Sequence, residues 1–551
     1  MTLQASGAIS LNDIQTEFGG ANPISLSEYY AGGSYVATGT AGIPSSSTIS
    51  LNQFYGASSV IPAWILVIDS GTSTTAGALE CLNAVKAYGG NLYATARLDP
   101  SVTYKGGIYT INPTTGSVIS TLGVSTNSSS TGVVGIDIDS SGNKYISISS
   151  TGYVSGKEQA LLLKLNSSNV VQWTQTINSP DYDAKARCVA LTPNQSYVIT
   201  QTSEVGSSVD TGFLGSAITH YSTGGTKSGS HRWFIMTTST SSGTGIPLDN
   251  SVTTPIGANI SFHSNGTNYA VTTTAKRTIY DTANYKYVYS SGGLTVKMQQ
   301  DYTGTTNNGF RGTLSGSNNG QTGAGNVVIG DFVYALTTAT PTADTNANTK
   351  YTTLTKMNFI TPSFFSSTTT TWQRTLYSGS SAQEAVAVAK DSSDNIYLIS
   401  NNDGVIHIAK YNTDGTIQWQ RQLYRTNDND GTTYKIYATS IIVDTTSTFV
   451  ITGYRYSPSA NFYSSLMIKL PVDGSKTGTY SASASFGGTW VYQAASWTES
   501  GTTTLTTFAW GNANYQTTSY STRNPQYISA TAPAISSSLG FDSNPVIKSF
   551  N

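Results

Sequence analysis

Short runs of alternating apolar and polar residues, separated by turn-forming residues, repeat along most of the chain from Ile61 onward. In Ile136–Ile146, an alternating strand enters a turn of Asp, Ser, Gly and Asn, after which a second strand begins. Val386–Leu398 repeats this hairpin, and a second hairpin follows in both copies. Two hairpins per unit predict a four-stranded antiparallel blade.

One position in a strand of each unit recurs as a marker. These markers are Tyr93, Tyr145, Tyr197, Tyr269, Tyr334, Tyr397 and Phe449, with Leu505 as a weaker eighth. Successive markers are 52 to 72 residues apart, a period typical of propeller blades or solenoid repeats. No unit has a convincing helical pattern. The sequence therefore predicts an all-β fold, an eight-bladed β-propeller, with seven blades as the alternative because the Leu505 unit is degenerate.

A tryptophan followed four residues later by Ile or Leu marks the outer strand of a blade. The pairs are Trp173 with Ile177, Trp372 with Leu376 and Trp419 with Leu423. Trp64 and Ile68 fit the same pattern, but no inner strands precede them. We therefore expect residues 63–70 to complete the C-terminal blade. Closing the ring in this way removes the exposed edge strands that favour aggregation.

The first 58 residues have a different pattern, in which one short element occurs three times. The copies are Ile9–Ile14, Ile24–Tyr29 and Ile49–Phe54. In each copy a serine followed three residues later by Asp, Glu or Gln predicts a capping box, and the flanking apolar residues form a hydrophobic staple. Glycines then end the helices after one to three turns. The pattern predicts three short, capped helices.

Helices this short are marginal in water and need a surface to pack on. They form either a self-contained minidomain or a docking peptide that folds against another protein, and we favour docking. The residues expected to make that contact are Ile9, Leu11, Ile14, Phe18, Ile24, Leu26, Tyr29, Tyr30, Ile49, Leu51, Phe54 and Tyr55. Residues 1–58 are thus expected to be a docking module with a linker, and residues 59–551 the propeller.

The stretches Ser6–Val36 and Ser45–Ala57 resemble an N-terminal module of tail-fibre and other virion proteins in tailed phages, notably phages of cyanobacteria and marine bacteria. The resemblance implies membership of a virion and attachment to its tail, baseplate or capsid proteins. The strand repeats resemble the β-propeller repeats of bacterial surface and secreted proteins. Because those repeats occur in proteins of many functions, this second resemblance supports the fold and not an activity.

The composition of the chain restricts the classes of partner that the protein can bind and the places where it can be located. Only 10% of residues are charged and the net charge is -1, so no basic field attracts nucleic acid. The N-terminus has no signal-peptide pattern, and no apolar run is long enough to span a membrane. The two cysteines, Cys81 and Cys188, indicate neither a disulfide framework nor a zinc site. We expect synthesis in the host cytoplasm and a final location in the virion.

Residue patterns give little sign of catalysis, and no cofactor is indicated. His220 and His407 align with inner positions of the second hairpin, which favours a structural role. Acidic residues such as Asp139, Asp391 and Asp414 lie in turns, where they close hairpins. Units such as the one containing Tyr411–Trp419 also resemble the blades of quinone-dependent dehydrogenases. Members of that family often carry an adjacent cysteine pair, which this chain lacks.

One polar loop is a weak candidate for a metal site. Residues 427–431 contain Asp428 and Asp430 before a glycine. With that glycine at the sixth position of an EF-hand loop, Thr426 and Tyr437 would occupy the first and twelfth positions, where the motif needs acidic ligands. An ordinary polar loop is therefore favoured, and no metal is expected.

These observations predict a non-enzymatic virion structural protein, a fibre or adhesin of the tail or baseplate that is oligomeric on the particle. Loops at the propeller rim are the candidates for contact with a host-surface glycan or protein, since tyrosines with small polar residues adapt to such partners. The residues singled out are Tyr280, Asn284, Tyr285 and Tyr287. The alternatives are a purely architectural decoration of the capsid or tail, and a surface-glycan hydrolase, which would need two converging carboxylates.

Overall fold

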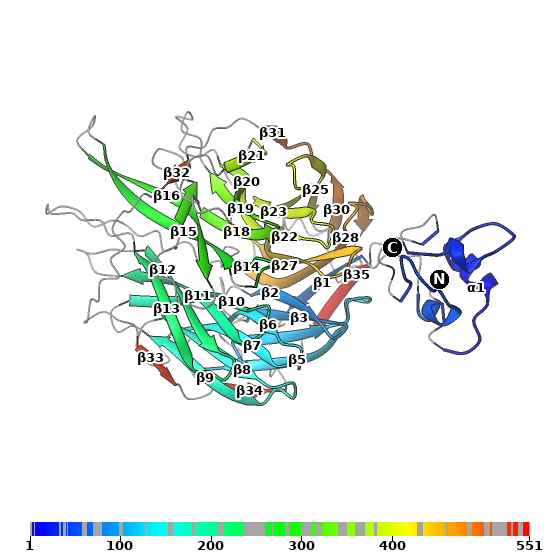
Figure 1. The fold of residues 1–551 in the computed structure, drawn as a ribbon, viewed down its shortest axis with the longest axis horizontal. Coiled ribbons are helices and arrows are strands. Elements are labelled where there is room, and N and C mark those ends of the chain that lie inside the picture. The colour runs from blue at the N-terminus through cyan, green and yellow to red at the C-terminus, as the bar shows by residue number, and fades with distance from the viewer. Residues whose placement is uncertain are drawn as a thin grey trace.

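The structure of the protein is a computed structural model, and it divides into a small N-terminal module and a large all-β part (Figure 1). The residues it describes are 3–4, 6–31, 35–36, 40, 42–57, 63–69, 80–98, 103–126, 130–151, 158–178, 182–206, 214–234, 259–266, 268–281, 286–299, 310–313, 322–339, 350–358, 370–379, 383–426, 434–458, 461–481, 488–500, 507–509, 526–529, 533–537 and 544–549.

The N-terminal module contains the three expected helical elements: α1 (Leu11–Phe18), η1 (Leu26–Glu28) and η2 (Leu51–Phe54). Capping boxes form at Ser10 and Ser50 as predicted. At Ser25 the expected box is absent, because this side chain accepts from the amide of Ser27 instead.

Seven four-stranded antiparallel units can be traced in the described part of the all-β region. Unit 1 comprises β2 (Cys81–Tyr88), β3 (Asn91–Arg97), β4 (Gly106–Ile111) and β5 (Val118–Ser125). Unit 2 comprises β6 (Ser130–Ile138), β7 (Lys144–Thr151), β8 (Glu158–Leu165) and β9 (Val171–Asn178). Unit 3 comprises β10 (Tyr182–Leu191), β11 (Tyr197–Gly206), β12 (Leu214–Ser222) and β13 (Lys227–Phe234).

Unit 4 comprises β14 (Ile260–Phe262), β15 (Asn268–Asp281), β16 (Lys286–Gln299) and β17 (Phe310–Thr313), and unit 5 comprises β18 (Thr322–Ile329), β19 (Phe332–Ala339), β20 (Tyr351–Asn358) and β21 (Thr370–Tyr377). Unit 6 comprises β22 (Gln383–Lys390), β23 (Ile396–Asn402), β24 (Val405–Tyr411) and β25 (Ile417–Arg425). Unit 7 comprises β26 (Lys435–Val443), β27 (Thr448–Ser457) and β28 (Phe462–Pro471), with β1 (Trp64–Asp69) as its fourth strand.

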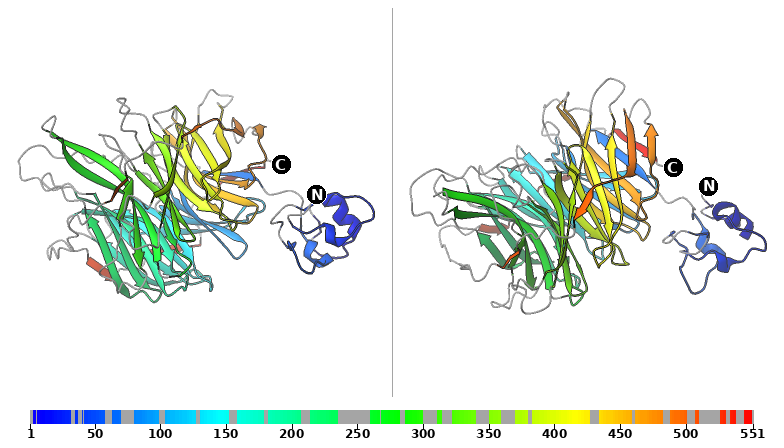
Figure 2. Two further views of the ribbon diagram at one scale, coloured as in Figure 1. Left: turned by 45° about the horizontal axis from the view of Figure 1, so that its top comes forward. Right: turned by 90° about the horizontal axis from the view of Figure 1, so that it is seen from above.

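The units form a propeller-like ring. Each first strand lies against the first strand of the next unit, and β26 of unit 7 lies against β2 of unit 1. Figures 1 and 2 show these sheets fanned around a common centre. The markers from Tyr93 to Phe449 all lie on the second strand of their unit. The expected count of eight blades is not confirmed, and Leu505, the marker of the eighth, lies outside the described residues.

Closure uses the expected strand with a different partner. Strand β1 pairs antiparallel with β28, so that Trp64 lies opposite Lys469 and Ile68 opposite Ser465. It therefore completes the Phe449 unit, and the expected closure with a C-terminal unit around Leu505 is corrected. The physical reason is that strands flanking Leu505 are already paired with the outer strands of earlier units.

After unit 7 the chain runs back around the ring. The hairpin partner β29 (Gly478–Ser481) leads into six short strands that we call the belt: β30 (Thr489–Ala494), β31 (Thr498–Ser500), β32 (Thr507–Ala509), β33 (Gln526–Ser529), β34 (Ala534–Ser536) and β35 (Asn544–Ser549). In chain order they pair antiparallel with β25, β21, β17, β9, β5 and β1.

The belt therefore adds a fifth strand to units 6, 5, 4, 2, 1 and 7 in turn, so it follows the ring in the direction opposite to that of the units. Figure 1 shows these orange to red strands at the outer edges of sheets coloured blue, green and yellow. An outer strand without a neighbour presents unpaired N–H and C=O groups that can template aggregation. Belt pairing satisfies those groups within the same chain.

We predict that the belt contributes to stability mainly through its buried side chains. Trp490 of β30 is 0% exposed and packs in the core shared by units 6 and 7. Trp490→Ala should lower the free energy of unfolding by about 3–5 kcal/mol, measured by urea unfolding with circular dichroism. Gln493→Ala, an exposed position on the same strand, is the control. Equal unfolding curves for the two variants would show that β30 is not packed as described.

Candidate functional site: module surface, closure junction and tyrosine row

The N-terminal module has a core of its own. Ile14, Tyr29 and Phe54 are each 0% exposed, and Phe18 is buried beside them. The rings of Phe18 and Tyr29 both meet Phe54 edge-on, with centroids 6.2 and 6.4 Å away. The module is thus held by the staple residues of all three repeats. These four side chains were expected to contact a partner, and that expectation is corrected because the staples turn inward.

Hydrogen bonds between distant residues hold this small core together. The Leu3 amide donates to the Ala57 carbonyl over 2.9 Å, which joins the two ends of the module. The Tyr29 hydroxyl donates to the Gly19 carbonyl over 2.9 Å. The hydroxyls of Tyr30 and Tyr55, both expected in the docking contact, donate to the carbonyls of Ser47 and Gly7. These contacts favour the minidomain alternative for the fold of the module.

The remaining residues of the expected docking set are partly exposed. They are Ile9, Leu11, Ile24, Leu26, Tyr30, Ile49 and Leu51, with Tyr55 more exposed than these. Leu11, Leu26 and Leu51 each occupy the first helical position after a serine. The repeat therefore places one leucine at an equivalent, half-buried position three times on the module surface.

Adjacent units of the propeller are joined by a recurring tryptophan contact. Each indole donates through Nε1 to a carbonyl in the last turn of the next unit: Trp173 to Thr223, Trp372 to Thr413, Trp419 to Val472 and Trp64 to Pro113, over 3.1 to 3.3 Å. A glycine with positive φ lies under each ring: Gly225, Gly415, Gly474 and Gly116. A Cβ there would approach the indole to within 2.8 or 2.9 Å, so the turn must have glycine.

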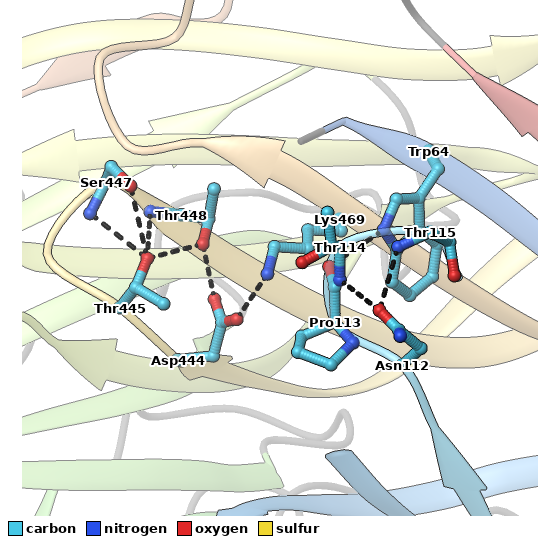
Figure 3. A network of polar contacts seen from close by, with 10 residues as sticks. All are labelled: Trp64, Asn112, Pro113, Thr114, Thr115, Asp444, Thr445, Ser447, Thr448 and Lys469. Atoms are coloured by element: carbon cyan, nitrogen blue, oxygen red, sulfur yellow. Dashed lines mark hydrogen bonds and ion pairs between the residues drawn. The ribbon is translucent and has the colours of Figure 1, made fainter. Parts of the chain in front are cut away.

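The closure junction is this contact made by the first strand of the ring (Figure 3). Trp64 lies over the turn after Asn112, whose side-chain oxygen accepts from the amides of Thr114 and Thr115 over 2.8 and 3.1 Å. Beside Trp64, Lys469 forms an ion pair with Asp444 over 2.6 Å, and both side chains are at most 3% exposed. The Trp64 indole therefore joins units 7 and 1, and the buried ion pair lies within unit 7 beside that contact.

Comparison with two other units explains the buried lysine. In units 2 and 6, the turn aspartates Asp139 and Asp391 accept a bond from the marker tyrosines, Tyr145 and Tyr397. In unit 7 the marker is Phe449, which has no hydroxyl. Lys469 and the Thr448 hydroxyl donate to Asp444 instead, over 2.6 and 2.8 Å. The lysine thus supplies the donor that the phenylalanine lacks.

The acidic turn residues have the structural role expected from the sequence. Asp391 accepts from the amides of Ser393 and Asn395, from the Asn395 side chain and from the Tyr397 hydroxyl, over 2.8 to 2.9 Å. Burial alone would raise the pKa of Asp391, but these donated bonds outweigh it and hold the pKa below its usual value. Asp139 has the same set of bonds and the same direction of pKa shift.

The histidines with described side chains make structural contacts. His220 Nε2 lies 2.6 Å from the Tyr269 hydroxyl, joining units 3 and 4. The His407 ring stacks flat against the ring of Trp497, a residue in the segment between β30 and β31, and the ring centroids are 3.7 Å apart. His407 Nε2 is also hydrogen-bonded to the side-chain oxygen of Gln420 over 2.9 Å. Burial lowers the pKa of His407 to about 3. His407 is therefore neutral at physiological pH and forms part of the contact between unit 6 and the belt.

Other sequence-predicted sites fall largely outside the described residues. These include Asp428 and Asp430 of the polar loop, and Asn284 and Tyr285 of the rim loop. Tyr280 and Tyr287 lie opposite each other across β15 and β16. Among described residues, no group of three or more His, Cys, Asp and Glu could hold a metal. No described helix is long and apolar enough to cross a membrane.

Sequence reasoning missed a row of stacked tyrosines at one end of unit 7, which we call the tyrosine row: Tyr437, Tyr454, Tyr463 and Tyr456. Tyr437 and Tyr454 stack with centroids 5.1 Å apart, and Tyr456 and Tyr463 with centroids 4.5 Å apart. Tyr454 and Tyr463 join the two pairs over 5.6 Å. All four side chains are partly exposed. The signal was present in the dense tyrosines of β26 to β28.

Comparisons with known proteins give little further information. No family model and no curated protein matches the chain. Among solved structures, prolyl oligopeptidase B from Galerina marginata is similar at 11% identity and a TM-score of 0.35, covering 71% of this chain and 51% of that chain. The chain thus spans about half the length of the peptidase.

Two further solved structures are similar at the same level. A protein of unknown function from Dyadobacter fermentans has 10% identity and a TM-score of 0.34, covering 61% of this chain and 93% of that chain. A Synechocystis apocarotenoid oxygenase variant has 11% identity and a TM-score of 0.31, covering 60% and 68%. Likeness this slight carries no functional argument, and the fold is established from the strand pairing itself.

We predict that Lys469 is essential to the closure junction. Lys469→Met would leave Asp444 buried without its cation and should lower the free energy of unfolding by about 3–5 kcal/mol. Lys410→Met is the matched control, since Lys410 holds the same strand position in unit 6 but donates to the Val472 carbonyl. It should cost about 1 kcal/mol. Chemical unfolding of both variants compares them, and equal losses would contradict the special role of Lys469.

We predict that His407 makes stability depend on pH. An unfolded histidine binds a proton below its usual pKa of 6.5, whereas folded His407 stays neutral down to about 3. Since the unfolded state then binds more protons, stability should fall as pH drops from 6.5 towards 3. His407→Gln should flatten this part of the stability profile. At pH 8 the histidine is neutral in both the folded and the unfolded state, so the difference in unfolding free energy there measures only the lost packing. An unchanged slope in thermal unfolding between pH 6.5 and 4 would contradict the assignment.

Proposed function

We propose that this protein is a non-enzymatic structural component of a tailed-phage particle, a fibre or adhesin of the tail or baseplate. The N-terminal module attaches it to other virion proteins, and the propeller is presented for contact with the host surface. The observation that carries this proposal is the module itself. A compact unit resembling virion N-terminal modules repeats one capped turn three times and leaves a leucine half-buried at each.

The equivalent leucines make the module suitable as an anchor. Its core is already filled by Ile14, Tyr29 and Phe54, so docking need not wait for folding on the partner. Leu11 and Leu26 are partly exposed and can lose the rest of their apolar surface to a partner. Attachment of a preformed unit avoids most of the entropy cost that a disordered docking peptide would meet.

The propeller is suited to presentation because short belt strands cover the long outer strands of six of the described units. Each covered sheet then ends in a strand of only three to six residues. Such short edges offer less length for unwanted strand addition at high local copy number. Several polar side chains are committed to structure, as in the turn bonds of Asp139 and Asp391. These features support an interaction scaffold more than a catalyst.

The anchor is tested by placing charge on the three leucines. Leu11→Asp, Leu26→Asp and Leu51→Asp are combined in one variant, in which aspartate is favourable at the first position of each helix. Because Leu26 and Leu51 also pack on the module core, circular dichroism and melting of the purified variant must first show that the module is still folded. Charge at a buried interface opposes docking, and purified particles should lack the protein by immunoblot. The control is Asn12→Asp, Ser27→Asp and Asn52→Asp, at the exposed neighbouring positions. Equal incorporation of the two triple variants would refute the anchor.

A further inference from the structure

The tyrosine row crosses three strands at one end of unit 7. Tyr437 belongs to β26, Tyr454 and Tyr456 to β27, and Tyr463 to β28. In the strand register Tyr437 lies opposite Tyr454, and Tyr456 lies opposite Tyr463. Successive strands are about 4.8 Å apart, so the row forms a continuous aromatic strip about 10 Å long. It extends from the innermost strand of the unit to its third strand.

The chemistry of the row suits hydroxyl-rich ligands. Each tyrosine combines an apolar ring with a hydroxyl group, so one side chain can cover C–H groups and form a hydrogen bond. Burial raises the pKa of Tyr437 to about 12 and also raises the pKa of Tyr454 and Tyr463. Their hydroxyls therefore remain donors at physiological pH. The Tyr456 hydroxyl already reaches the Asn461 side chain over 3.4 Å.

The ionisable groups nearest the row are Lys435, Asp403 and Glu384, and burial raises the pKa of the Glu384 carboxyl. Lys435 forms an ion pair with Asp403 over 2.6 Å. Arg455 lies between Tyr454 and Tyr456 on β27, so it points to the opposite face of the sheet. There it donates to the Ser464 hydroxyl over 3.1 Å and lies over the Tyr434 ring, 4.6 Å from its centroid. Such committed charges give little attraction to a polyanion such as nucleic acid. The surroundings favour a ligand that is polar but uncharged.

From this arrangement we infer that the tyrosine row is a binding site for a neutral saccharide chain of the host surface. This inference rests on the proposed function and names the ligand class that the propeller recognises. Stacked pairs hold each ring in a fixed orientation before binding, which reduces the entropy cost of ordering the side chains. The C–H faces of a short oligosaccharide would then cover the tyrosine rings, and its hydroxyl groups would form hydrogen bonds with the phenolic hydroxyls.

The inference is tested with purified full-length protein on an array of bacterial surface polysaccharides and neutral oligosaccharides, with dextran sulfate as a polyanion. Wild-type protein should bind neutral glycans. Tyr456→Ala with Tyr463→Ala should weaken that binding at least about tenfold, equivalent to about 1.4 kcal/mol. Tyr351→Ala with Tyr377→Ala is the matched control, since those rings stack at 4.7 Å in unit 5. The control should bind like wild type.

A purely structural role is separated by Tyr456→Phe with Tyr463→Phe, which retains the stack and removes two hydroxyls, and by melting temperatures for every variant. Loss of binding in the alanine pair at an unchanged melting temperature supports the site. Absence of wild-type binding to every neutral glycan, or equal binding by the alanine pair and wild type, overturns it. Particle incorporation is measured separately, so a protein that is anchored but does not bind glycans refutes this inference and leaves the proposed function intact.

Discussion

The pairing of β1 with β28 is the interaction on which the propeller depends. It joins a strand at the beginning of the ring to one about four hundred residues later in the chain. Without it, unit 7 would have three strands and Trp64 would not reach the turn of unit 1. The buried Lys469–Asp444 pair lies within unit 7 beside this ladder, because Lys469 is opposite Trp64 in the register, and breaking such a pair is costly.

Other junctions repeat one solution with local substitutions. An indole on the fourth strand, a glycine in the next turn and a lysine on the third strand recur in units 2, 5 and 6. Where unit 7 replaces the marker tyrosine by Phe449, its lysine changes partner, and the turn carboxylate keeps a strong donor. The units therefore retain a pattern of satisfied polar groups more strictly than a pattern of residues.

Much of the ring could be predicted because its signals are local. Tryptophan with an apolar residue four positions later identified β9, β21, β25 and β1, since one side chain must cap a neighbouring turn and the other must face the core. The belt could not be predicted, because strands such as Thr498–Ser500 are too short for any period and owe their conformation to the edges they meet. The sequence prediction assigned the residues around Leu505 to an eighth blade, and it therefore gave β1 the wrong partner.

The candidate sites were harder to predict for a related reason. Apolar residues of the N-terminal repeats were interpreted as a surface, because sequence does not reveal that Leu3 and Ala57 pair and let three staples share one core. The tyrosine row depends on register across β26, β27 and β28, which fixes which rings meet. Tyrosines can be counted from sequence, but their stacking follows from pairing over long distances in the chain.

Strand β1 lies between β28 and β35 and is bonded antiparallel on both sides. Residues 63–68 are all buried, from Ala63 to Ile68. A pull applied through the chain before Ala63 would act along the axis of this strand, while its hydrogen bonds run perpendicular to that axis. The load would therefore be shared in shear by two ladders at once. A tether attached there is resisted collectively, whereas a tether at the free end of an edge strand would peel it away one bond at a time.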